Sequence, residues 1–225
     1  MAVPELAIID VGHGNSAVVT HESGVVVIDT GKGDALLQFL LERGIKEIDE
    51  VLLSHADADH IGGLVALLSV RNVKVKMVRL NTDSQKASAL WDDMLYALDR
   101  QGVQWAPSLT PQDNAALNRG DLKVEVLAPS RYLAGKVPGG QDRKRRRLSS
   151  NSVSAVLRVL VSGLPRALLA GDLDGIGLDN LLESVADNRK PSGAPVRGDR
   201  LRQGPHGYGR APQALQLRPG LQRGD

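Results

Sequence analysis

Four side chains that can bind metal ions stand close together near residue 57, and this cluster constrains the fold more than any other part of the sequence. Its members are His55, Asp57, Asp59 and His60. Residues 48–54, just before the cluster, form a mostly apolar run of strand length, and residues 61–70 are apolar over the length of a helix. The cluster is therefore predicted to lie where a buried strand passes into a helix, so that its side chains can face one cavity.

Imidazole nitrogen and carboxylate oxygen are ligands that suit zinc, manganese or iron. Four of them in one turn exceed the needs of a single ion, so the cofactor prediction is two divalent metals, zinc first, with manganese or iron as alternatives. The chain has no cysteine, which excludes thiolate ligands and disulfides. The competing interpretation is a solvated polar loop in which Asp59 caps the helix. It is disfavoured, because two His and two Asp at this spacing rarely occur without a metal.

The motif His55-Ala56-Asp57-Ala58-Asp59-His60 resembles the H-x-[HD]-x-D-H signature of the metallo-β-lactamase superfamily, in its Asp-containing variant. Four other segments resemble further blocks of that superfamily, two before the motif and two after it. These segments are residues 10–16, 27–31, 151–152 and 169–172. Within the superfamily, the chain resembles the branch that contains the hydrolase domain of bacterial DNA-uptake channel proteins. The resemblance covers about residues 5–185.

The resemblance implies an α/β fold with four layers in the order αββα, formed by a hydrolase domain at residues 1–186. It also implies that His55 and Asp57 serve one ion, that Asp59 and His60 serve the other, and that Asp172 bridges both. Asp59 would in addition orient the attacking water. A second group of residues would support the metal ligands rather than bind metal themselves. That group is Asp10, His13, Asp29 and Asn151.

The resemblance further implies a hydrolase that activates water at its metal centre, with a phosphodiester as the preferred substrate and other small molecules as alternatives. No run of eighteen apolar residues is present, so the sequence predicts no membrane segment. The first residues lack a basic region followed by an apolar segment, which favours a cytoplasmic location.

Five consecutive cations offer a second candidate site, one that would bind nucleic acid. They are Arg143, Lys144, Arg145, Arg146 and Arg147. Such a run attracts phosphate groups, and in a nuclease it would hold the backbone of a nucleic acid. The alternative is a mobile, solvated loop within residues 130–150. The loop is the favoured interpretation, because no nucleic-acid-binding motif surrounds the run.

Residues 187–225 differ in composition from the rest of the chain. They are rich in Gly, Pro and Arg without apolar periodicity, so we expect a disordered basic tail. In the resembled family, a strand and a Pro-His-His-Gly turn in this region bring the last metal ligand to the site. This chain has only Gly204-Pro205-His206-Gly207, and His206 is predicted not to be a ligand. The composition suggests a shifted reading frame. The alternative function is therefore a homologue that keeps the fold in a binding or regulatory role with little catalysis.

Overall fold

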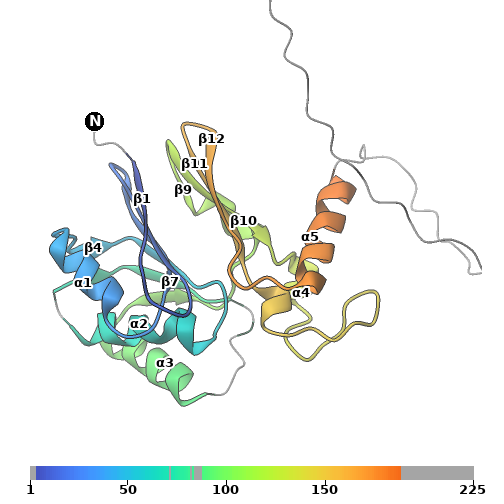
Figure 1. Ribbon diagram of the computed structural model, residues 1–225, viewed down its shortest axis with the longest axis horizontal. Helices are drawn as coiled ribbons and strands as arrows, with labels where there is room; N and C mark the ends of the chain where they lie inside the picture. The colour runs from blue at the N-terminus through green and yellow to red at the C-terminus, as the bar shows by residue number, and fades with distance from the viewer. Residues whose placement is uncertain (1–3, 71, 82, 84–87, 189–225) are drawn as a thin grey trace, which may run out of the picture. The chain divides into compact units, whose positions relative to one another are not determined.

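Two β-sheets pack face to face, with helices on their outer faces, in a computed structural model of the chain (Figure 1). The structure describes residues 4–188 apart from residues 71, 82 and 84–87. The predicted α/β fold with αββα layers is confirmed. The predicted tail lies outside the described residues from residue 189 on, and so does His206. The proposed domain boundary after residue 186 therefore stays a prediction.

The first sheet has six strands and holds the first half of the chain. In sheet order they are β1 (Glu5–Ile8), β2 (Ser16–His21), β3 (Gly24–Thr30), β5 (Glu50–Leu52), β7 (Met77–Arg79) and β8 (Gln104–Ala106). The first three strands form an antiparallel meander, and β5, β7 and β8 continue the sheet in parallel with β3. A separate parallel pair consists of β4 (Glu47–Ile48) and β6 (Lys74–Val75).

The second sheet has four antiparallel strands. In sheet order they are β12 (Leu164–Leu169), β11 (Val156–Val161), β10 (Leu122–Ala128) and β9 (Asn118–Arg119). Within the residues described, no strand follows β12. The chain continues instead into α5 (Gly175–Asn188).

Alternating apolar side chains explain why the two sheets stack. One face of the first sheet meets the inner face of the second in a buried cluster that includes Val19, Val26, Leu52, Val124 and Leu157. The opposite face of the first sheet packs against three helices, where Val18, Val51, Leu40 and Leu64 are buried. These helices are α1 (Ala35–Glu42), α2 (Ala58–Ser69) and α3 (Ala89–Gln101). The inner strands β2, β3 and β5 thus bury side chains on both faces, whereas the outer strands β1 and β8 are largely exposed.

Residues 130–150 are not the predicted unstructured loop. They contain α4 (Arg131–Ala134) and a hairpin in which Gln141 pairs with Arg147, followed by the short helix η2 (Asn151–Val153). Leu133, Leu148 and Val153 form a small buried cluster there. This long-range packing orders a segment whose local sequence has no regular periodicity.

The helix α3 is capped by Ser88, whose Oγ accepts a hydrogen bond from the backbone N–H of Trp91 at 3.2 Å. The described helices are all too short or too polar to cross a bilayer. The cytoplasmic location stays a prediction.

Candidate metal centre

The sequence cluster lies at the carboxyl end of β5, a central strand of the first sheet. β5 runs parallel to β3 and β7, and the chain leaves it through Ser54 and His55 toward α2. Ligand sites in α/β proteins commonly form at this end of parallel strands. α2 begins at Ala58 and its N-cap position is Asp57, so Asp59 lies within the first turn. The interpretation of Asp59 as the helix cap is therefore wrong.

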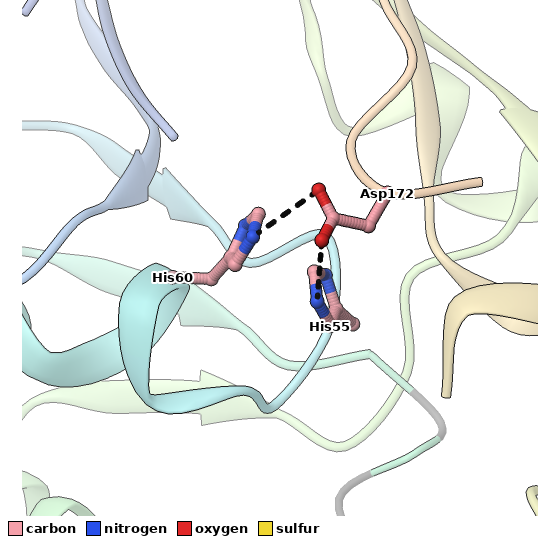
Figure 2. Close-up of side chains that lie close together, drawn as sticks. All are labelled: His55, His60 and Asp172. Carbon is pink, nitrogen blue, oxygen red and sulfur yellow. Dashed lines mark ion pairs between the residues drawn. The ribbon is translucent and has the colours of Figure 1, made fainter. Parts of the chain in front are cut away.

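Figure 2 shows His55 and His60 directed at Asp172, which comes from the segment after β12 of the second sheet. The Nε2 of His60 lies 3.5 Å from Oδ1 of Asp172, and the Nε2 of His55 lies 3.9 Å from Oδ2. One ligand atom from each of the three residues lies within 4.8 Å of the other two. The two sheets therefore each contribute ligand atoms to one centre.

Both imidazoles are fully buried, which rules out a solvated polar loop at these positions. Their Nε2 atoms have no hydrogen-bond partner among the described residues. A buried polar atom without a partner is costly, so a structure that retains two of them side by side needs a compensating ligand. The donor set fits a divalent metal, because donors around tetrahedral zinc lie roughly 3.4 Å apart. That spacing is close to the observed separations.

Asp29, at the end of β3, fixes the orientation of the metal loop. Its buried carboxylate accepts hydrogen bonds from the backbone N–H and the Oγ of Ser54, at 2.7 and 2.6 Å, and lies 2.9 Å from Nδ1 of His60. Because a carboxylate only accepts, the His60 Nδ1 carries the proton. Ser54 Oγ donates to Asp29, so it accepts from His55 Nδ1 at 3.0 Å. In the neutral rings both Nε2 lone pairs are then available to a metal.

The two histidines have pKa values shifted in opposite directions. Burial lowers the pKa of His55, and the neighbouring charge of His60 lowers it further. Burial alone would also lower the pKa of His60, but its hydrogen bond to Asp29 and the nearby carboxylates outweigh burial and raise it. His55 is thus the ring that is held neutral.

The other two carboxylates of the motif lie beside the three-residue group rather than in it. Oδ2 of Asp57 is 4.0 Å from Nε2 of His55, and its side chain is about one-third exposed. Oδ2 of Asp59 faces the loop between β1 and β2, where it lies 3.7 Å from Nε2 of the exposed His13. Both carboxylates border the centre on its open side.

Asp10 and Asn151 have contacts that shape loops. Oδ1 of Asp10, which is exposed, accepts a hydrogen bond from the backbone N–H of Gly12 at 3.0 Å. The backbone oxygen of Asn151 accepts from the N–H groups of Ser154 and Asp174. Among the described residues, neither side chain forms a hydrogen bond or ion pair with the three central ligands, so their supporting role stays a prediction.

Four polar residues around the centre were not predicted. Ser154 lies 3.5 Å from Nδ1 of His55 through its Oγ, which also accepts from the backbone N–H of Asp172 at 3.2 Å. Asn81 donates to the backbone oxygens of Ser54 and Val153, and Asp83 accepts from the N–H of Ala56 at 2.8 Å. Ser54 itself is the fourth. The available signal was that Asn81 and Asp83 follow the parallel strand β7.

Gly171 allows the second sheet to approach the metal loop. It has a φ of +53°, and a Cβ at this position would lie 2.5 Å from Ser154 Oγ and 3.1 Å from Ser54 Cβ. Only glycine fits such a close approach without a shift in its neighbours. The residue that follows, Asp172, is thereby placed against the two histidines. A cavity of about 170 Å³ adjoins this contact and is lined in part by Asn15, Asp29 and Ser54.

An αββα sandwich with His and Asp ligands where its two sheets meet defines a class of metallohydrolases. The chain belongs to this class: it is a member of the metallo-beta-lactamase superfamily, whose family model matches residues 9–203. The resemblance drawn from the motif at residues 55–60 is therefore confirmed.

Two competence proteins are similar to most of this chain. ComE operon protein 3 of Bacillus subtilis is 29% identical over 224 residues, which cover 90% of this chain and 25% of that protein. Competence protein ComA of Neisseria gonorrhoeae is 25% identical over 195 residues, which cover 83% of this chain and 23% of that protein. The chain thus spans about a quarter of the length of these relatives. A solved metallo-beta-lactamase from Staphylococcus aureus is 14% identical, with a TM-score of 0.49, over 84% of this chain and 52% of that one.

Proposed function

We propose that this chain is a metal-dependent hydrolase of phosphodiesters. The observation that carries the proposal is the pair of buried Nε2 atoms of His55 and His60, both directed at Asp172 and without hydrogen-bond partners among the described residues. Similarity to competence proteins, the branch associated with DNA uptake, supports a phosphodiester over other substrates.

The proposed centre holds two divalent ions, with zinc preferred over manganese or iron because two imidazoles supply its nitrogen ligands. His55 and Asp57 would hold one ion, and Asp59 and His60 the other. Asp172 suits the position between them, since its two oxygens face different histidines. A bound ion would make a water molecule acidic enough to lose a proton near neutral pH. It would also stabilise the negative charge that develops on the substrate.

The residues of the chain have three further tasks in this proposal. Asp29 and Ser54 fix both imidazoles with their Nε2 lone pairs facing the centre. Asp59, on the open side, accepts a hydrogen bond from the attacking water and thereby orients it. The Asp59 carboxylate can also receive the proton that this water loses. No Ser or Cys nucleophile is required.

Hydrolysis of bis(p-nitrophenyl) phosphate with added zinc or manganese tests the proposal. We expect activity in the full chain and a loss of about 100-fold or more in Asp59→Ala, in the range of removing a general base. Asp93→Ala removes an exposed carboxylate of α3 and serves as the control, which should keep full activity. A metal-loaded protein that does not hydrolyse phosphodiesters but cleaves a lactam or a thioester would contradict the substrate assignment.

A second candidate function is a binding or regulatory role with little catalysis. It is favoured by one observation: within the described residues, only three ligand residues form a compact group, and Asp57 and Asp59 lie outside it. Elemental analysis of the purified chain separates the two functions. Two tightly bound ions per chain would contradict the regulatory role, whereas one ion or none, together with absent activity, would support it.

A further inference from the structure

The five-cation run forms an ordered turn, residues 141–147, which we call the basic hairpin. Gln141 pairs with Arg147, and the backbone oxygen of Arg146 accepts from the N–H of Asp142 at 3.0 Å. The Asp142 carboxylate lies buried under the turn, where it accepts from the N–H groups of Lys144 and Arg146 at 2.8 and 2.9 Å. These contacts define the backbone of the basic hairpin, which is the yellow loop beside α4 and α5 in Figure 1.

Two of the five cations attach the basic hairpin to α5. Nη1 of Arg146 lies 2.6 Å from Oδ2 of Asp179, and Nζ of Lys144 lies 2.5 Å from Oε1 of Glu183. Arg146 also contacts Asp142. The charges of Lys144 and Arg146 are therefore neutralised locally, and their role is structural.

The remaining three cations are exposed and make no ion pair among the described residues. Arg145, with a φ of +61°, and Arg147 are both exposed. The guanidinium carbon of Arg143 lies 5.0 Å from the ring centre of Tyr132, and Nζ of Lys136 lies 5.6 Å from it. A cation–π contact positions a charge without cancelling it. Arg143 and Lys136 thus lie beside an aromatic ring, and Arg145 and Arg147 add two exposed charges within the basic hairpin.

The basic hairpin is linked to the metal centre by two short segments. Ser154, whose Oγ contacts His55, lies seven positions after Arg147, and an extended chain of that length spans at most roughly 25 Å. The helix to which the basic hairpin is attached, α5, begins three residues after Asp172. A flexible polymer bound at the basic hairpin can therefore reach the metal centre.

We propose that the basic hairpin binds the phosphate backbone of a single-stranded nucleic acid through Arg143, Arg145 and Arg147. Lys136 adds a further charge beside Tyr132. Sequence-tolerant binding of single strands combines such a row of cations with an aromatic side chain. The binding claim goes beyond the proposed function, and only delivery of the strand to the metal centre rests on that function.

The chemistry of the neighbouring helix favours nucleic acid over an anionic membrane. A helix that lies on a membrane carries Lys and Arg beside its apolar face. α5 does expose Leu178 and Leu182, but the polar residues beside them are the acids Asp179 and Glu183, which are already paired with Arg146 and Lys144, so this helix lacks the cations that would hold it on an anionic membrane.

Fluorescence anisotropy tests the inference with the full chain and a labelled, cleavage-resistant phosphorothioate oligothymidylate of about 20 nucleotides. We expect the double substitution Arg145→Gln and Arg147→Gln to weaken binding about tenfold and to reduce the slope of log affinity against log salt by about 1.4. The control, Lys46→Gln with Lys74→Gln, removes two exposed charges near the β4–β6 pair. Both double variants retain the basic tail, so its contribution cancels in the comparison.

Two outcomes would overturn the inference. One is an equal loss of oligonucleotide affinity in the two double variants, or no loss of affinity in either. Binding would then not involve the basic hairpin. The other is unchanged oligonucleotide binding together with lost binding to phosphatidylserine vesicles, which would assign the surface to a membrane. Circular dichroism confirms that each variant is folded. Because the assay needs no hydrolysis, an inactive protein that still binds through Arg145 and Arg147 would contradict the proposed function alone.

Discussion

The carboxylate of Asp29 lies 2.9 Å from Nδ1 of His60, so a residue at the end of β3 determines which nitrogen of a candidate metal ligand faces the centre. Asp29 has a φ of +55°, a conformation uncommon for residues other than glycine. Such an outlier is retained where the surrounding contacts stabilise it. Here those contacts are the hydrogen bonds from Ser54 and His60.

Removing the Asp29 carboxylate should weaken metal binding without touching a metal ligand. Asp29→Ala leaves the buried donors of Ser54 and His60 unpaired, so we expect a stability loss of about 3 kcal/mol. The metal affinity should fall roughly 10- to 100-fold. Urea unfolding and isothermal titration with zinc measure the two effects. Asp93→Ala, which removes an exposed carboxylate on α3, should change neither; an unaltered zinc affinity in Asp29→Ala would refute the role of Asp29.

The adjacent glycines of α2 should respond oppositely to alanine. At Gly63 a Cβ would overlap the backbone oxygen of Thr30, whereas at Gly62 the nearest atom would be 3.4 Å away. We expect Gly63→Ala to push α2, and His60 with it, away from β3 and to cost about 2 kcal/mol or more. Gly62→Ala should be neutral or stabilise by up to about 1 kcal/mol, because alanine favours helix. Thermal unfolding of the two variants distinguishes these effects. Equal changes in stability would show that α2 does not pack closely against β3 at Gly63.

The basic hairpin should lose its stabilisation in acid. Burial alone would raise the pKa of Asp142, but the hydrogen bonds from the backbone and side chain of Arg146, and from Asn180, lower it from 3.8 to about 2. A lowered carboxyl pKa stabilises the fold above the unfolded value and loses that contribution as pH falls through the folded value. The Tm advantage of the wild type over Asp142→Asn should therefore be constant at neutral pH and shrink between pH 3.8 and about 2. A difference in Tm that does not vary with pH would contradict this origin.

A buried ion pair next to the inner face of the sandwich should be sensitive to truncation. Nε of Arg79 lies 3.3 Å from Glu50, whose side chain is 6% exposed, and Nη1 lies 3.1 Å from Asp113. Burial raises the pKa of Glu50, and the opposing effect of the nearby Arg79 does not outweigh it. Arg79→Ala should cost about 3 kcal/mol, because it leaves a buried carboxylate with less compensation.

The exposed pair of Arg158 with Glu125 is the matched control for Arg79. Its truncation, Arg158→Ala, should cost less than about 1 kcal/mol. In a double-mutant cycle, adding Glu50→Ala to Arg79→Ala should recover part of the loss, since the uncompensated charge is removed. Strictly additive effects would show that the two side chains do not interact.

Local patterns were sufficient for the position of the metal loop, whereas the αββα architecture was predicted through the resemblance to a known family. The meander at residues 5–30 follows from alternating apolar residues and turn glycines. The placement of His55 to His60 follows from the spacing of ligand residues between a strand and a helix. These signals lie within a few residues of one another. They required no knowledge of which distant segments meet.

The parts that sequence reasoning missed depend on contacts between distant segments. Ser54 is an unremarkable residue in the sequence, and its importance arises from Asp29, which is twenty-five positions away. Likewise, five consecutive cations look equivalent until α5 places acids beside Lys144 and Arg146. Such roles depend on which residues meet in three dimensions.

Because each sheet is built from one continuous half of the chain, the metal centre cannot be completed early in synthesis. The first half of the chain carries His55 and His60, but Asp172 follows only after the strands of the second sheet. A ribosome-bound intermediate would thus offer two imidazoles without the carboxylate between them. Acquisition of the metal would then come late in biogenesis, after the two halves have docked.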